Sequence, residues 1–167
     1  ISMFRKGDTK NAIPIIDSLI RDIPENPYFW ELKGQALLEG GAPAKALASL
    51  RQANKLLPNS GLIQILYAQA LIATEDRANI KQALNLLTLA KKTERDSVDV
   101  YKYSALAYGY LNDLPRAELA TAEMAMMQGD TALASEKAKR VIGQFKHGSP
   151  EWMKANDVLN FTSKERN

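Results

Sequence analysis

The sequence contains no cysteine and a single histidine, His147, among its 167 residues. A chain without thiols forms no disulfide and no thiolate metal site, so its cysteine usage leaves the cellular compartment open. A zinc hydrolase needs two histidines one helical turn apart and a glutamate base, which one histidine cannot supply. No phosphate-binding loop and no Gly-x-Ser-x-Gly nucleophile motif is present. We therefore expect a non-enzymatic chain without catalytic, metal-binding or cofactor-binding residues, and a structural or solvated role for His147.

The sequence also lacks long apolar runs and a large excess of either positive or negative charge. The uncharged stretch Ser60 to Thr74 is shorter than the roughly 20 apolar residues of a membrane-spanning helix, so we expect a buried helix there. The 22 basic and 19 acidic residues are spread along the chain and give a net charge of +3. No basic block favours a nucleic-acid partner. The sequence thus predicts neither a membrane span nor nucleic-acid binding.

Strand patterns are almost absent, whereas apolar residues recur at intervals of three and four positions. Proline near the start of segments and glycine or asparagine between them are typical of helix boundaries. The sequence therefore predicts an all-α fold, with helices over residues 9–22, 27–40, 43–56, 61–74, 78–92, 98–111, 115–128, 131–146 and 150–161.

A 34-residue period relates these segments. Ala12 and Ala46 lie 34 residues apart, as do Pro24 and Pro58, and this is the length of a tetratricopeptide repeat (TPR). Residues 27–60 resemble one whole repeat of that family. Antiparallel helices approach closely only where the residues at their contact are small. On this pattern we assign to repeat packing Trp30, Gly34, Ala46, Ala53, Pro58, Ala83, Ala90 and Ala117.

The repeats vary along the chain, and the variation sets the predicted organisation. We expect Gly7 and Asp8 to form the turn inside a first repeat whose first helix is incomplete, which indicates a piece of a longer protein. The helix over 115–128 is expected to close one pair while opening another, because the next repeat begins after half a period. The prediction is a single TPR solenoid over residues 1–161 that forms a right-handed superhelix. Its parts are a truncated repeat 1–26, repeat 27–60, repeat 61–97 with a three-residue insertion, overlapping degenerate repeats 98–130 and 115–148, and a capping helix 149–161. A polar tail, residues 162–167, follows.

The order of whole, inserted and degenerate repeats resembles the C-terminal half of BepA-type bacterial periplasmic zinc metalloproteases, in the HtpX-like peptidase superfamily. Residues 39–74, 107–140 and 148–159 carry this resemblance. It implies a periplasmic, non-catalytic domain that contacts protein substrates and the outer-membrane assembly machinery in outer-membrane protein quality control. It also implies a zinc-dependent endopeptidase domain, with its HExxH zinc site, outside these residues.

First helices line the concave groove of a TPR solenoid, so we expect a protein-binding groove there. Its mixture of apolar side chains and amides suits an extended or helical protein segment. Gln35 and Gln69 are predicted to form its centre, and Tyr103 and Tyr110 its far wall. The predicted lining residues are Tyr28, Glu31, Leu32, Gln35, Leu38, Leu62, Ile65, Leu66, Gln69, Ile72, Lys102, Tyr103, Leu106 and Tyr110.

Other interpretations stay open at this point. The chain can instead be an intramolecular regulatory or self-association domain that packs on its own protease domain, or a free-standing TPR adaptor. Met124, Met126 and Met127 either fill the core of a distorted repeat or form an adaptable binding surface. Clusters such as Lys91-Lys92 are solvated helix faces or, in the alternative, contacts for anions or lipid.

Overall fold

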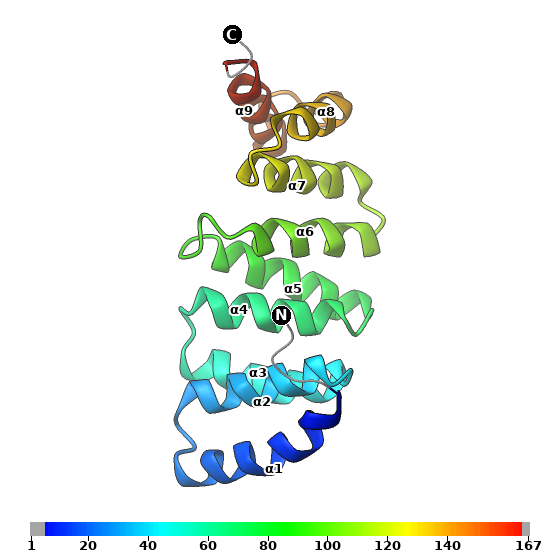
Figure 1. Cartoon of the computed structure of the whole chain (residues 1–167). Coiled ribbons are helices and arrows are strands. Elements are labelled where there is room, and N and C mark those ends of the chain that lie inside the picture. Colours follow the sequence, from blue (N-terminus) through cyan, green and yellow to red (C-terminus); the bar gives the residue numbers. More distant parts are fainter. Residues whose placement is uncertain (1–5, 165–167) are drawn as a thin grey trace. The chain divides into compact units, whose positions relative to one another are not determined.

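The computed structural model describes residues 6–164, apart from the side chains of residues 6–8 and 10. This range contains no strand, so the prediction of an all-α fold is confirmed for it. The helices, shown in Figure 1, are α1 (Lys6–Asp22), α2 (Pro27–Glu39), α3 (Pro43–Leu56), α4 (Gly61–Ile72), α5 (Arg77–Ala90), α6 (Val98–Tyr110), α7 (Leu114–Met127), α8 (Thr131–Val141), the 3-10 helix η1 (Ile142–Gln144) and α9 (Pro150–Lys164).

Three helices differ from the prediction by three residues or more. Helix α9 continues to Lys164, so residues 162–164 of the predicted polar tail are helical, and Thr162 is buried. Helix α1 begins at Lys6, so Gly7 and Asp8 lie in its first turn and the predicted inter-helix turn at these residues is wrong. The incomplete helix predicted before that turn falls on residues 1–5, which lie outside the described residues. Helix α8 ends at Val141 and not near residue 146, because the chain tightens into η1 and then becomes extended at Phe145.

Polar side chains start most of the helices. Asn26 accepts a hydrogen bond from the Tyr28 amide at 3.0 Å, and Asp76 accepts one from the Asn79 amide at 2.8 Å. Such caps satisfy amides that have no partner within the helix. Glu75, in the turn with the predicted three-residue insertion, has a φ of 56°, in the left-handed region that non-glycine residues rarely adopt. Caps and turns thus explain the helix boundaries.

The chain divides into two compact units, residues 1–95 and 96–167, and each is described by itself. In unit 1, each helix from α1 to α5 packs against the next along the chain, and α2 also contacts α4. The core of unit 1 is centred on α4, where Ile63, Tyr67 and Leu71 are buried. The buried helix predicted from the uncharged run is therefore confirmed. The single solenoid over residues 1–161 stays a prediction.

Small residues hold the helix pair α2 and α3 close together. A Cβ atom added at Gly34 of α2 would overlap the side chain of Leu50 on α3, which is fully buried. Ala46 and Ala53 of α3 are also fully buried. Of the other residues assigned to packing, Ala83 and Ala90 are buried, Trp30 and Ala117 are half-buried, and Pro58 is exposed.

Unit 2 is organised around α7, which packs against α6, α8 and α9. Its core is built largely from alanine, and one cluster consists of Ala122, Ala125, Ala134, Ala138 and Val158. Alanine at so many contacts lets three helices approach α7 together. The half-period spacing in the sequence therefore corresponds to one helix with several partners.

Candidate protein-interaction surface

The two first helices of unit 1, α2 and α4, carry most of the predicted groove residues. Positions 34 residues apart are equivalent on these helices, so Tyr28 corresponds to Leu62 and Leu32 corresponds to Leu66. Tyr28 and Leu62 are 60% and 62% exposed. We call the predicted lining residues of α2 and α4 that are not buried the first-helix face; they are Tyr28, Glu31, Leu32, Gln35, Leu38, Leu62, Leu66 and Gln69.

Two predicted lining residues lie below this face. Ile65 and Ile72 of α4 are only 7% and 2% exposed, and they belong to the core. The reason is that α4 packs against α2, α3 and α5 and carries almost no polar side chain, so little of its circumference is accessible. These two isoleucines support the first-helix face and offer no surface to a ligand.

The predicted central amides are both half-buried and are not part of the core. The Gln35 amide Nε2 donates to Oε1 of Glu39, one turn further along α2, at 2.9 Å. Gln35 is therefore held along its own helix in this structure. A ligand that bonds Gln35 would compete with this contact, whereas no such intrahelical bond is described for Gln69. Their role at the centre of a groove stays a prediction.

Glu31 is the carboxylate at the middle of the first-helix face. Burial raises the pKa of Glu31, because the ionised carboxylate loses part of its hydration. Lys33 does not compensate, because it lies two residues further along α2, on a different side of the helix, and its Nζ binds Oδ1 of Asp17 on α1 at 2.6 Å. Glu31 is thus a partly desolvated anion on an otherwise largely apolar surface.

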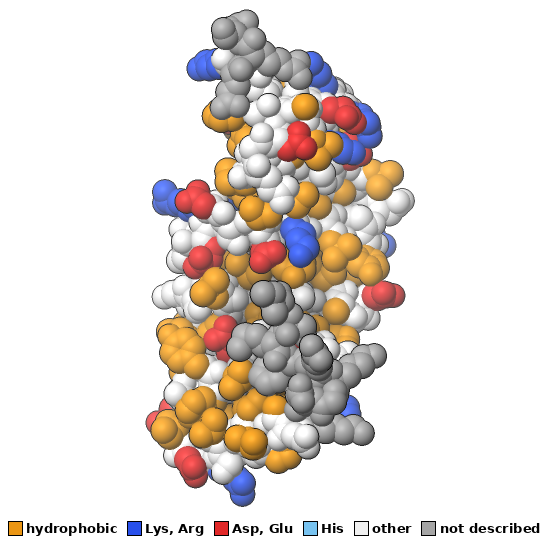
Figure 2. Space-filling model, viewed as in Figure 1, with side chains coloured by type: hydrophobic (Ala, Val, Ile, Leu, Met, Phe, Trp, Pro, Cys, Tyr) orange, Lys and Arg blue, Asp and Glu red, His pale blue; other side chains and the backbone are white. Residues whose placement is uncertain are grey.

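Charge is divided between the first and second helices of unit 1. Helices α3 and α5 carry lysines and arginines and no acidic residue, whereas α4 carries no charged residue and α2 carries two glutamates with Lys33. The basic side chains are exposed; they are Lys45, Arg51, Lys55, Arg77 and Lys81. The first-helix face and the second helices therefore differ in sign of charge. Figure 2 shows hydrophobic side chains gathered over α1 and α2 on the side in view.

The remaining predicted groove residues lie on α6 in unit 2. Leu106 and Tyr110 are 47% and 45% exposed and border a shallow hollow with Ala105 and Gly109. Lys102 lies 5.1 Å from the ring centre of Tyr103. Burial, and then the charge of Asp99, raise the pKa of Tyr103. The far wall formed by Tyr103 and Tyr110 stays a prediction, because α6 is described only within unit 2.

Sequence reasoning missed a pair of equivalent hydrogen bonds, each of which joins a first helix to the loop before it. Trp30 Nε1 donates to the carbonyl of Pro24 at 2.7 Å, and Gln64 Nε2 donates to the carbonyl of Pro58 at 2.7 Å. Both donors and both acceptors are 34 residues apart. The period of the prolines was visible in the sequence, but a tryptophan and a glutamine do not look alike. Their shared property is an N–H donor on a long side chain.

A family model described as "Cytochrome c-type biogenesis protein H TPR domain" matches residues 17–130, more than half of the chain. The chain belongs to this TPR family. The matched residues run from within α1 to the turn after α7, and they include the whole first-helix face. No curated protein sequence matches the chain significantly.

The solved structures that resemble the chain include the following two. The MamA RS-1 ArsTM double mutant superposes with a TM-score of 0.69 at 16% identity, covering 98% of this chain and 89% of that one. TTC0263, a thermophilic TPR protein of Thermus thermophilus, superposes with a TM-score of 0.55 at 17% identity, covering 92% of each chain. At these identities the likeness shows the fold alone, and it confirms the TPR class predicted from the 34-residue period.

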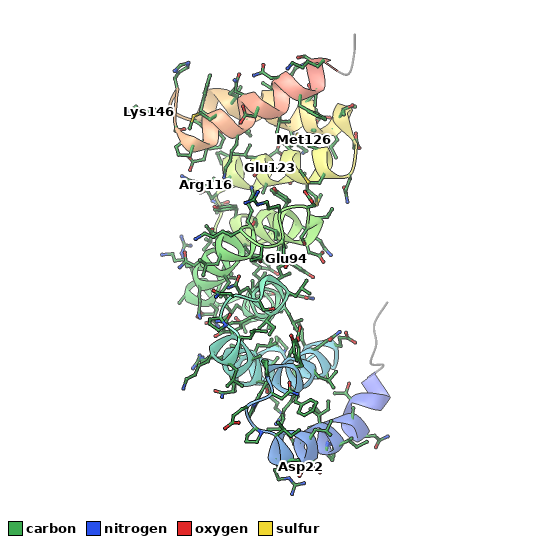
Figure 3. The ribbon with its side chains drawn as sticks, turned by 90° about the vertical axis from the view of Figure 1, so that its left-hand side faces the viewer. Asp22, Glu94, Arg116, Glu123, Met126 and Lys146 are labelled. Carbon is green, nitrogen blue, oxygen red and sulfur yellow. The ribbon has the colours of Figure 1, made fainter. Side chains whose placement is uncertain are left out.

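Within this TPR domain, other residues noted in the sequence have structural contacts. His147 packs on Trp152 with ring centres 4.2 Å apart. Met126 packs against the alanine core of unit 2. Arg116, Glu123 and Met126 follow one another along α7 (Figure 3). Among residues 6–164, no group of three acidic or histidine side chains is placed to hold a metal, and no described helix is long and apolar enough to cross a membrane.

Proposed function

We propose that this chain is a non-catalytic protein-interaction module that holds a segment of a partner protein on the first-helix face of unit 1. The observation that supports it best is the exposure of Tyr28 and Leu62, at 60% and 62%, at equivalent positions of neighbouring helices. Large apolar side chains exposed side by side are typical of binding surfaces. Membership of a TPR family agrees with this role, since stacked repeats present extended binding surfaces.

The name of the family gives the proposal a cellular context. We place the partner among the proteins of cytochrome c-type biogenesis, which the family description names. Because that process takes place on the periplasmic side of bacterial membranes, the chain acts in the periplasm on this proposal. It needs no cofactor of its own, because holding a protein segment requires no chemistry.

The alternative context is the one implied by the order of the repeats. In it, the chain is the C-terminal domain of a zinc metalloendopeptidase that acts in outer-membrane protein quality control. The first-helix face would then bind protease substrates or the assembly machinery, or pack on the protease domain as a regulatory or self-association element. Zinc would belong to the protease domain. In a third variant the chain acts as a free-standing TPR adaptor.

Photo-crosslinking from matched positions tests the proposal. A photoreactive amino acid replaces Leu62 on the first-helix face or Leu89 on α5, which is 45% exposed, and the protein is irradiated in its bacterial host. We expect Leu62 to give a defined adduct with a protein of cytochrome c-type biogenesis and Leu89 to give none. An adduct with a protease domain or its substrates would support the alternative context. Equal labelling from both positions would overturn binding at this face.

A further inference from the structure

One carboxylate on the first-helix face has no partner for its charge among the described residues. Glu31 lies one helical turn after Tyr28 and one turn before Gln35, so these side chains share one side of α2. No ion pair or hydrogen bond to the Glu31 carboxylate occurs within residues 6–164 as the structure describes them. Lys33 is bound to Asp17, and the Gln35 amide donates to Glu39. A half-buried anion in this state favours a cation supplied from outside the fold.

The surroundings of Glu31 are apolar where they are accessible. The position equivalent to Glu31 on α4 is Ile65, so the face contains a single carboxylate at this level and not an acidic row across both helices. Tyr28 lies one turn before Glu31 on α2, Leu62 and Leu66 lie on either side of the equivalent position on α4, and all three are accessible apolar side chains. Lysine and arginine combine a cationic head with an apolar stem that packs along such surface. The chemistry of the site therefore matches a basic side chain between apolar ones.

The division of charge in unit 1 points to the same kind of ligand. The exposed lysines and arginines of α3 and α5 repel a basic segment, while the one cation of α2 and α4, Lys33, is paired with Asp17 on α1. An acidic segment experiences the opposite preference. The charge pattern thus directs a basic segment to α2 and α4 and away from the second helices.

We infer that the first-helix face of unit 1 binds a protein segment that carries a lysine or arginine flanked by apolar residues, with the basic group placed on Glu31. This inference rests on the proposed function and adds the chemistry of the partner. It also excludes the acidic C-termini that TPR domains bind through a clamp of lysine and asparagine. The equivalent first-helix positions of unit 1 are Glu31, Gln35, Ile65 and Gln69, which contain no cation.

Peptide selection with matched proteins tests the inference. A displayed library of random 12-residue peptides is panned in parallel against the whole chain, Glu31→Gln and the control Glu25→Gln, which changes an exposed glutamate in the turn before α2. Circular dichroism establishes that all three proteins are folded. We expect the parent and Glu25→Gln to enrich peptides with lysine or arginine between apolar residues. The Glu31→Gln protein should lose this preference.

The strongest peptide is then synthesised with its basic residue intact or replaced by glutamine, and affinities are measured by fluorescence anisotropy. The replacement should weaken binding to the parent about tenfold, as expected for one charge-assisted hydrogen bond, and should leave binding to Glu31→Gln unchanged. Competition by a peptide with an acidic C-terminus should be absent.

The possible failures separate the inference from the proposed function. Peptides that bind the parent and Glu31→Gln equally well, or selected peptides that are acidic, would overturn the inference and leave the proposed function intact. No enrichment with any protein would overturn both. Sedimentation equilibrium could instead reveal a dimer of the parent that Glu31→Gln does not form. This result would identify the basic α3 or α5 of a second copy of the chain as the occupant of the face, and it would overturn the inference that a partner segment binds there.

Discussion

Units 1 and 2 reach the same helix-pair architecture with different side chains. In unit 1 the fully buried residues include Tyr67, Leu50 and Ile63, and the tight helix contact depends on one glycine, Gly34. In unit 2 alanines dominate the core around α7. The contacts of unit 1 thus combine large and small residues, whereas alanine makes up more of the core around α7, beside larger residues such as Leu119 and Val141.

Among the described residues, ion pairs between helices join α1 to α2 in unit 1, through Asp17 and Lys33, and join α7 to both α8 and α9 in unit 2. In unit 2, Glu118 of α7 binds both Lys137 and Arg140 of α8, at 3.1 and 3.2 Å. Arg116 of α7 likewise binds Glu151 of α9 at 2.8 Å. An alanine core buries less apolar area per residue, so connections between helix surfaces are relatively more important for holding the helices in register. The comparison teaches that a repeat which departs from the period can keep its fold through charge and small residues.

The largest expected effect comes from adding one methyl group at a glycine of each unit. Gly34→Ala places a Cβ against Leu50, whereas nothing lies within 4 Å of a Cβ added at Gly109 on α6. Gly34→Ala should destabilise the protein by about 1 to 3 kcal/mol through overpacking. Gly109→Ala should stabilise α6 by about 0.5 to 1 kcal/mol through helix propensity. Urea unfolding of both variants checks the prediction, and equal effects would contradict the role given to Gly34.

A smaller effect is expected from the hydrogen bond between α4 and the loop before it. Gln64→Leu keeps the approximate volume of the side chain and removes the donor to the Pro58 carbonyl. It should lower the free energy of unfolding by about 1 kcal/mol, the typical net value of such a bond. Thermal unfolding measures this loss. The control Gln82→Leu removes an exposed side chain at the long 3.3 Å contact with Tyr67 and should cost less; the reverse order would sink the assignment.

Ionised Glu31 should lower the stability of the folded protein, although it should strengthen binding of a basic segment. Its pKa is raised by burial, so the folded state favours the protonated carboxyl and loses stability as pH rises from the unfolded pKa through the folded pKa. Glu31→Gln should therefore be slightly more stable than the parent at pH 7. The advantage should vanish below about pH 4, near the ordinary pKa of glutamate. Melting curves of both proteins at the two pH values provide the check, and a less stable variant at pH 7 would count against the desolvated carboxylate.

The smallest expected effect has the opposite pH dependence and belongs to unit 2. Hydrogen bonds from Arg116 lower the pKa of Glu151, so this pair stabilises the fold above the unfolded pKa and the contribution is lost as pH falls through the folded pKa. Glu151→Gln should cost at most about 1 kcal/mol at pH 7, because the pair is partly exposed. The difference should disappear in acid and shrink in high salt. A cost that persists at low pH would show that packing, and not charge, is responsible.

Helix positions could be predicted closely because the sequence marks them with local chemistry. Prolines stand at the first positions of α2, α3 and α9, and polar caps such as Asn26 and Asp130 precede helices. The start of α1 was missed because Gly7 and Asp8, which usually indicate a turn, also fit the first turn of a helix. A local pattern therefore predicts a helix boundary only when its residues fit one kind of local structure and not two.

The accessible surface was less predictable than the helices. The repeat pattern gave equivalent positions, but it assigned Ile65 and Ile72 to the groove although α4 is covered on several sides. It also gave no indication that Lys33 binds Asp17 on the preceding helix. Exposure and pairing depend on neighbouring helices, and a pattern along one helix does not contain that information.

The bonds from Trp30 to Pro24 and from Gln64 to Pro58 have a consequence for how unit 1 unfolds. Each joins the end of one repeat to the first helix of the next, so each adds to the nearest-neighbour coupling of a one-dimensional array and not to the stability of a single repeat. Strong coupling makes the repeats melt in one sharp transition. Loss of the Gln64 bond should weaken the coupling between α1–α3 and α4–α5, and amide hydrogen exchange should then report two separate opening free energies in one polypeptide.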